Sequence, residues 1–269
     1  MNGIKKKFPK IILITGASGY IGGNLIQYIK QSNDYDVIPV SRRHGFDLTK
    51  DNWTKNLPNK RVDTIIHLAQ SNNYRDFPAG GEDMLKVNVN STYYLLEWAR
   101  SNNVKKFMFS STGNVYKPDE NPFKEDYCRQ PESFYGSSKL IAENLITQYN
   151  NFFETIVMRL FAVYGGNQKE MLIPNMIKKI KNNEEITLAQ GKGLVFNPIY
   201  IQDCIKIIYD LMVKDFDDSN LTINIAGEDK IDLSYIISNL EKLLSLSANC
   251  KITNQKVLDF SADISLLKN

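Results

Sequence analysis

Short apolar runs alternate with segments of helical periodicity along the first two-thirds of the chain. The runs predict strands over residues 10–14, 37–40, 64–68, 106–110 and 155–160. The segments between them repeat apolar residues every three or four positions, which predicts helices over 20–31, 84–100 and 137–149. Strands that are apolar on both faces need helices on both sides. The pattern therefore predicts an α/β fold, a Rossmann-type doubly wound parallel sheet.

The alternation changes after residue 166. Helices are predicted over 171–181, 203–213 and 234–246, and a strand over 222–225. We expect a dinucleotide-binding Rossmann domain over residues 1–167, to which 196–220 returns. A small α/β substrate-binding lobe is expected to comprise 168–195 and 221–269.

Composition excludes several classes of protein. The 269 residues include 33 Lys and Arg against 30 Asp and Glu, with no basic stripe, so no nucleic-acid partner is expected. The apolar run 11–14 is too short for a signal peptide, and no stretch reaches membrane-spanning length. Cys128, Cys204 and Cys250 are widely spaced, which predicts neither a disulfide framework nor a metal site. A cytoplasmic protein is the simplest expectation.

A glycine-rich turn joins the first predicted strand to the first predicted helix. Gly16 permits the tight turn, Gly19 lets the backbone approach a pyrophosphate, and Gly22 lets the helix pack against the strand. The helix N-terminus then offers free N–H groups to phosphate oxygens. This arrangement predicts a nicotinamide-dinucleotide site. The alternative is a glycine turn that holds no ligand.

Further motifs follow in order, and together they resemble the extended short-chain dehydrogenase/reductase superfamily, in its sugar-nucleotide epimerase/dehydratase/reductase branch. The resemblance covers nearly the whole chain and rests on residues 16–22, 67–69, 88–90, 109–112, 115–116, 135–139, 159–165, 198–201 and 224–227. It implies an enzyme with a nucleotide-sugar substrate and a homodimer formed through helices 84–100 and 137–149. Tyr93, Tyr94 and Trp98 add aromatic surface to the first of these helices, for which ordinary core packing is the alternative.

Tyr135 and Lys139 are four residues apart, so their side chains share one helix face. A nearby ammonium favours the phenolate, which lets a tyrosine exchange a proton with a carbonyl oxygen as hydride moves. By resemblance, Thr112 hydrogen-bonds the substrate oxygen and completes a proton-transfer triad. His67 lies within a predicted buried strand, which favours a packed core histidine over a catalyst.

The second predicted strand ends in Ser41-Arg42-Arg43, where dinucleotide folds often place a carboxylate for the ribose hydroxyls. Guanidinium groups suit a 2′-phosphate, which a carboxylate would repel. We therefore expect NADP(H), with NAD(H) as the alternative if these arginines are merely solvated.

The resemblance also implies contacts with the dinucleotide elsewhere along the chain. The residues concerned are Ser18, Tyr20, Ile21, Asp47, Leu48, Leu68, Ala69, Gln70, Asn88, Ser110, Phe161 and Val163. An alternative for Asp47 is turn formation. Asn88 is expected to brace neighbouring backbone, and the alternative is an amide on the helix surface. Tyr74 and Arg75 either face substrate or lie in solvent.

Three positions depart from the family pattern. Ala162 stands where Asn is frequent, and Gly166 stands where a Pro often follows the Tyr-Gly pair. Phe196 stands where many relatives carry a diphosphate-binding arginine. Dehydratases usually have an acidic pair beside the Ser/Thr, but Thr112 is followed by Gly113-Asn114. The missing acids, together with Ser41, Arg42 and Arg43, favour NADPH-dependent reduction of a 4-keto-6-deoxy sugar nucleotide, within deoxysugar and polysaccharide biosynthesis. A 4-epimerase and a non-catalytic dinucleotide-sensing protein are the alternatives.

Overall fold

The computed structural model describes residues 9–117, 122–216 and 220–268. The chain divides into two compact units. Unit 1 contains Met1–Val115, Pro131–Met158 and Ile205–Thr222, and unit 2 contains Tyr116–Gln130, Arg159–Cys204 and Ile223–Asn269. The domain limits expected from the sequence stay a prediction.

A six-stranded sheet forms the centre of the fold, in the order β10-β5-β4-β3-β1-β2. β1 pairs in parallel with β2 and β3, and β3 pairs in parallel with β4. This confirms the predicted Rossmann-type α/β class. The strands are β1 (Lys10–Thr15), β2 (Tyr35–Val40), β3 (Thr64–His67), β4 (Lys106–Thr112), β5 (Glu154–Leu160) and β10 (Asn220–Ile225).

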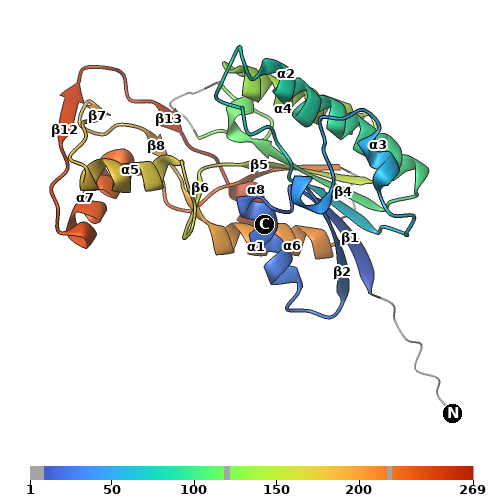
Figure 1. Ribbon diagram of the computed structural model, residues 1–269. Helices are drawn as coiled ribbons and strands as arrows, with labels where there is room; N and C mark the ends of the chain where they lie inside the picture. The colour runs from blue at the N-terminus through green and yellow to red at the C-terminus, as the bar shows by residue number, and fades with distance from the viewer. Residues whose placement is uncertain (1–8, 118–121, 217–219, 269) are drawn as a thin grey trace. The chain divides into compact units, whose positions relative to one another are not determined.

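Helices cover both faces of the sheet in unit 1 (Figure 1). α1 (Tyr20–Ile29) and α6 (Ile201–Val213) lie on one face, where the rings of Tyr28 and Tyr209 are 5.2 Å apart. α2 (Gly81–Met84), α3 (Ser91–Ser101) and α4 (Phe134–Thr147) lie on the other. This arrangement explains why the inner strands β1 and β3 are mostly apolar and buried, whereas Asp36 of the edge strand β2 is exposed.

The main core of unit 1 fills the space between the sheet and these helices. Leu95, Leu96 and Ala99 of α3 and Ala142 and Ile146 of α4 are each fully buried in it. Their spacing of three or four residues is the periodicity that predicted the helices.

Two helix boundaries differ from the sequence prediction. The helix expected over 84–100 is divided, because a π-helix (Leu85–Asn90) joins α2 to α3. The helix expected from residue 137 begins at Phe134, because the Ser133 hydroxyl accepts a hydrogen bond from the Gly136 N–H at 3.0 Å and caps it. Tyr135 therefore lies inside the first turn of α4.

Unit 2 combines helices with short strand pairs. β8 (Val195–Phe196) lies between β11 (Ile231–Asp232) and β13 (Asp259–Phe260), while β7 (Ile186–Ala189) pairs with β12 (Cys250–Thr253). The remaining elements are β6 (Val163–Tyr164), β9 (Ile199–Tyr200), α5 (Leu172–Lys181), α7 (Leu233–Leu244) and α8 (Ser265–Lys268).

The core of unit 2 includes Phe196, which is 2% exposed and belongs to a cluster with Met176, Leu188 and Leu233. The position at which many relatives carry an arginine is thus occupied by a core side chain in this protein. An arginine here would leave a charge among apolar neighbours.

No helix within residues 9–117, 122–216 and 220–268 is long and apolar enough to cross a membrane. In the same residues no group of three His, Cys, Asp or Glu side chains could hold a metal ion. The cysteines are free, with Cys204 buried and Cys128 and Cys250 exposed.

Candidate active site

The turn between β1 and α1 requires its glycines. Gly16 has a φ of +68°, and a Cβ there would lie 2.8 Å from the carbonyl carbon of Leu68 and 2.9 Å from the Ala69 nitrogen. A Cβ at Gly22 would lie 2.3 Å from the Gly16 oxygen. The first glycine therefore lets β1 approach the segment after β3, and the last lets α1 pack against the turn.

The N-terminus of α1 is suited to an anion. Gly19 occupies the N-cap position, no side chain caps the helix, and no acidic residue lies in its first turn. The helix dipole favours negative charge at this end. Ser18 and Gly19 are exposed on this turn. The residues present therefore fit a dinucleotide pyrophosphate.

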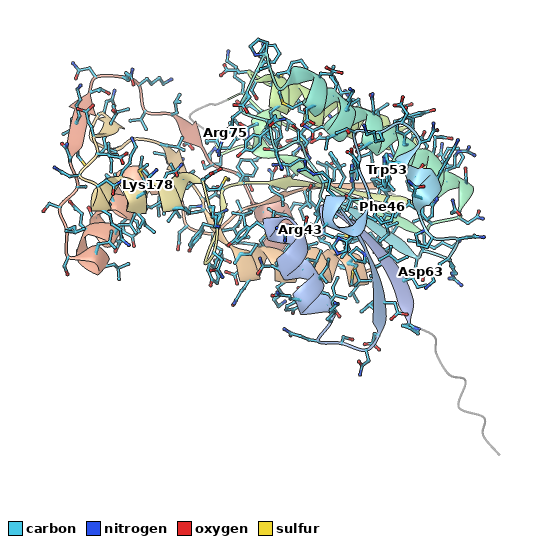
Figure 2. The ribbon with its side chains drawn as sticks, viewed as in Figure 1. Arg43, Phe46, Trp53, Asp63, Arg75 and Lys178 are labelled. Carbon is cyan, nitrogen blue, oxygen red and sulfur yellow. The ribbon has the colours of Figure 1, made fainter. Side chains whose placement is uncertain are left out.

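The carboxyl end of β2 lies beside the glycine turn, because the Ala17 N–H donates to the Val40 carbonyl at 3.3 Å. Ser41 is buried, with its hydroxyl 2.8 Å from the Nδ1 atom of His44. Arg42 and Arg43 are exposed in the short 3-10 helix that follows (Arg42–His44). Figure 2 shows Arg43 and Asp63 at opposite ends of the sheet.

Asp47 follows this end of β2, and its carboxylate accepts hydrogen bonds from the backbone N–H and the hydroxyl of Thr49, at 3.1 and 2.7 Å. The Thr49 hydroxyl is the main cause of the lowered pKa of Asp47, although partial burial opposes it. This geometry is that of a turn-forming aspartate. Leu48 is buried next to it in the core of unit 1.

His67 links three elements from inside the sheet. Thr92 donates its hydroxyl hydrogen to the Asn88 carbonyl at 2.8 Å, so it accepts from Nε2 of His67 at 3.0 Å. The other ring nitrogen, Nδ1, accepts from the Thr15 hydroxyl at 2.6 Å. Burial, with the nearby Lys139 ammonium, lowers the pKa of His67 to about 3. The neutral ring thus acts as a structural tie, consistent with a packed core histidine.

The proposed proton-transfer residues come from β4 and α4. Thr112 is buried at the last position of β4, where its hydroxyl accepts from the N–H and the side-chain amide of Asn114 at 3.2 and 3.0 Å. Lys139 is 1% exposed, and its ammonium donates to the carbonyl of Ser110 at 2.8 Å. Tyr135 is half-buried one helical turn before Lys139. All of these residues belong to unit 1.

Their surroundings determine their protonation. Burial raises the pKa of Tyr135 above its usual value, although interaction with the Thr112 hydroxyl opposes the change. Burial lowers the pKa of Lys139 to about 7, and the Glu143 carboxylate opposes that change. The tyrosine is therefore a neutral phenol near pH 7, which is the form that donates a proton.

The segment after β3 reaches the same site. Gln70 is exposed, and its side-chain oxygen accepts the Tyr135 hydroxyl at 2.9 Å. The ring of Tyr74 lies 5.1 Å from the ring of Tyr135, and the guanidinium of Arg75 lies 4.8 Å from the centre of the Tyr74 ring. The sequence is compatible with a Tyr74 that contacts substrate or lies in solvent, and the structure brings its ring against that of Tyr135.

Asn88 is fully buried in the π-helix and joins two backbones. Its side-chain oxygen accepts from the Ser71 N–H, and its amide donates to the Ser138 hydroxyl, both at 2.9 Å. Ser138 in turn donates to the Tyr135 carbonyl at 2.8 Å. This is a bracing role, and it fixes the segment after β3 against the first turn of α4.

Two residues predicted to contact the dinucleotide belong to unit 2. Phe161 is 1% exposed, among the rings of Tyr116, Phe123 and Phe260. Val163 is half-buried in β6. Their contact with a dinucleotide stays a prediction. Sequence reasoning also overlooked Glu143, whose only sequence signal is its position four residues after Lys139.

Comparison with known proteins identifies the family. The model of the NAD dependent epimerase/dehydratase family matches residues 12–226. The chain belongs to that family. It is therefore an enzyme of the short-chain dehydrogenase/reductase type, in an NAD(P)-dependent group that acts on nucleotide sugars.

Two curated members of this epimerase/dehydratase family illustrate its range. An uncharacterized UDP-glucose epimerase of Bacillus subtilis is 27% identical, over 96% of this chain and 90% of its own length. The GDP-6-deoxy-D-talose 4-dehydrogenase of Aggregatibacter actinomycetemcomitans is 30% identical, over 80% of this chain and 74% of its own length.

A solved structure of the epimerase/dehydratase family supports the assignment. The UDP-glucuronic acid 4-epimerase of Bacillus cereus, in complex with NAD, superimposes with a TM-score of 0.82 at 26% identity, over 95% of this chain and 88% of its own. The same epimerase is also known in complex with UDP-glucuronic acid and NAD. The likeness thus extends over almost the whole chain.

Proposed function

We propose that this enzyme catalyses NADP(H)-dependent reduction of a 4-keto-6-deoxy sugar nucleotide, giving a deoxysugar nucleotide for polysaccharide biosynthesis. The observation that carries the proposal is the end of β2. Arg42 and Arg43 are exposed there beside the glycine turn, and no carboxylate follows Val40 directly. Two guanidinium groups suit a 2′-phosphate, the group that distinguishes NADP from NAD.

The proposed chemistry is proton transfer coupled to hydride transfer. When bound, the reduced nicotinamide supplies the hydride to the carbonyl carbon of the sugar. Tyr135 gives its phenolic proton to the carbonyl oxygen, which Thr112 holds by a hydrogen bond. The Lys139 ammonium then stabilises the phenolate left on Tyr135. The neutral phenol, which donates to Gln70 in this structure, is already in the form needed by a general acid.

The residues beside Thr112 favour reduction over dehydration. Gly113 and Asn114 follow it, and the Asn114 amide donates to the Thr112 hydroxyl. Elimination across two sugar carbons needs an acid or base besides the tyrosine, and no carboxylate occupies these two positions.

One relative supports reaction at the fourth carbon. The enzyme from Aggregatibacter is described as a GDP-6-deoxy-D-talose 4-dehydrogenase, and it is 30% identical over 225 residues. Dehydrogenation at that carbon is the reverse of reducing a 4-keto group. We therefore place the substrate among 4-keto-6-deoxyhexoses carried on a nucleoside diphosphate.

The test is an assay with purified protein, NADPH or NADH, and 4-keto-6-deoxyhexoses linked to GDP or dTDP. The proposal predicts that one of them oxidises NADPH, and does so more efficiently than it oxidises NADH. No oxidation of NADPH with any of these substrates would contradict it.

A second candidate function is 4-epimerisation. It is favoured by the UDP-glucose epimerase and UDP-glucuronic acid 4-epimerase to which the chain is similar. This candidate predicts a dinucleotide that co-purifies with the protein, and interconversion of UDP-sugars without net consumption of nicotinamide. Mass spectrometry of the purified protein distinguishes the two candidate functions, because it shows whether a dinucleotide co-purifies and whether that dinucleotide is NAD or NADP.

We also propose a cytoplasmic homodimer that meets its partner through α3 and α4. Leu85, Tyr93 and Ile141 are 41%, 46% and 44% exposed on the π-helix, α3 and α4. Large apolar side chains grouped on neighbouring helices favour a protein partner. The cytoplasm is where a reductase finds reduced nicotinamide cofactor.

A further inference from the structure

Glu143 is a buried carboxylate on α4, one helical turn beyond Lys139 and two beyond Tyr135. It is 2% exposed, and its Oε1 atom accepts a hydrogen bond from the Ser111 hydroxyl on β4. A buried carboxylate is costly unless hydrogen bonds and an opposite charge compensate it. Neither the proposed chemistry nor the dinucleotide site uses this residue.

The opposite charge lies on Lys139. Its ammonium donates to the Ser110 carbonyl and lies 4.7 Å from the centre of the Phe109 ring. His67, which faces Lys139 from β3, is neutral. Two effects act on the pKa of Lys139. The Glu143 carboxylate raises this pKa and so favours the ammonium, whereas burial lowers it and favours the neutral amine.

Glu143 also joins the two elements that carry the proton-transfer residues. Tyr135 and Lys139 lie on α4, whereas Thr112 is the residue after Ser111 on β4. The hydrogen bond from Ser111 to Glu143 therefore fixes the end of β4 against α4, beside the hydroxyl that is expected to hold the substrate oxygen.

We propose that Glu143 is a positioning residue: its buried carboxylate favours the charged form of Lys139 and ties α4 to the strand end that carries Thr112. The inference deepens the proposed function, since it rests on Tyr135, Lys139 and Thr112 as the proton-transfer site. It assigns a role to a residue that touches no reacting atom.

Two variants separate the charge from the tether. Glu143→Gln removes the charge but keeps an oxygen that can accept from Ser111. Ser111→Ala keeps the charge but removes the hydrogen bond. We expect the Gln variant to lower the pH at which Lys139 titrates by about one pH unit or more. The Ala variant is expected to leave that titration in place and to lower kcat.

The titration is followed by NMR on protein labelled with ¹³C at lysine Cε, without dinucleotide or substrate. The Lys139 signal is assigned by its loss in Lys139→Met. An unchanged titration midpoint in Glu143→Gln would overturn the charge role, and an unchanged kcat in Ser111→Ala would overturn the tether. Because the titration needs no substrate, a wrong proposed reaction leaves its result intact.

If Glu143→Gln folds too poorly for the titration, a double-mutant cycle tests the coupling between Glu143 and Lys139. If the carboxylate acts through the lysine charge, adding Lys139→Met should restore much of the lost resistance to urea. Equal losses from Glu143→Gln with and without Lys139→Met would show that the two side chains are not coupled, and would overturn the proposal.

Discussion

Tyr135 is the residue at which three parts of unit 1 meet. Its hydroxyl donates to Gln70 after β3, its pKa responds to Thr112 on β4, and its backbone carbonyl accepts from Ser138 on α4. In the proposed mechanism, a substrate oxygen replaces the Gln70 amide as the acceptor of the Tyr135 hydroxyl. Under that mechanism, we expect changes to Tyr135 to affect the chemical step more than binding of the dinucleotide.

Tyr135→Phe should lower kcat by roughly 10²- to 10⁴-fold, because it removes the acid but leaves the ring in place. The dissociation constant of the dinucleotide, measured by fluorescence titration, should change little. Tyr235→Phe is the matched control, since Tyr235 is exposed on α7 and has no proposed role. Near-normal turnover by Tyr135→Phe would remove Tyr135 from the proposed mechanism.

Arg42→Ala and Arg43→Ala test the choice of dinucleotide. Loss of a charge-assisted contact with the 2′-phosphate should weaken NADPH binding about tenfold or more, with little effect on NADH. Arg61→Ala is the control, because Arg61 is exposed and pairs with Asp63 at 2.8 Å. If the Arg42 and Arg43 variants change the affinities for NADPH and NADH equally, the two arginines do not bind the 2′-phosphate and are merely solvated.

At the scale of elements, His67 ties β1 and β3 to α3 through its neutral ring. Its pKa is lowered from 6.5 to about 3, so the unfolded chain binds one more proton than the folded protein between these values. The contribution of the neutral His67 ring to the free energy of unfolding is complete above pH 6.5 and is lost as the pH falls towards 3. The expected slope is about 1.4 kcal/mol per pH unit.

Urea unfolding from pH 7 to pH 4 measures this contribution. The free energy of unfolding should fall less steeply with decreasing pH in His67→Gln than in the wild type. His44→Gln, at the exposed histidine of the loop after β2, should keep the wild-type slope. Parallel curves for the wild type and His67→Gln would contradict the account of a buried neutral ring.

Element prediction succeeded where apolar periodicity was long. The strands of the central sheet and α1 and α3 agree with it to within a few residues, apart from the π-helix that divides the helix expected over 84–100. The apolar pattern does not predict that π-helix, within which Asn88 contacts Ser71 and Ser138, distant in the chain. The two-residue strands β8, β11 and β13 are too short to show an alternating pattern.

At the scale of the whole molecule, the alternation of apolar runs and helical segments predicted the fold. The resemblance carried by the ordered motifs, the glycine turn and the Tyr135–Lys139 pair among them, predicted the kind of enzyme. The residues that hold the site together were not predictable, because their partners are set by packing between β4 and α4. Glu143 is the main example, since four residues from a lysine it looks like an ordinary surface ion pair on a helix. Its burial and its bond to Ser111, which the sequence does not show, are the grounds for the role that we propose.

The proposed homodimer makes a separate prediction at this scale. Replacing Tyr93 and Ile141 together by Arg places charges on the exposed apolar surface of α3 and α4, so the protein should sediment as a monomer. Tyr235→Arg with Leu243→Arg, at exposed positions of α7, is the matched control and should leave the sedimentation coefficient unchanged. A wild-type protein that sediments as a monomer would dismiss the dimer.

The central claim is net hydride transfer from NADPH to the fourth carbon of a nucleotide-linked 4-keto sugar. The most direct test supplies NADPH carrying two deuterium atoms at the fourth carbon of its nicotinamide ring, and examines the sugar product by mass spectrometry and NMR. The account predicts one deuterium at the fourth carbon of the sugar for each NADP formed. A sugar epimerised at that carbon without deuterium, and with no NADP formed, would contradict it.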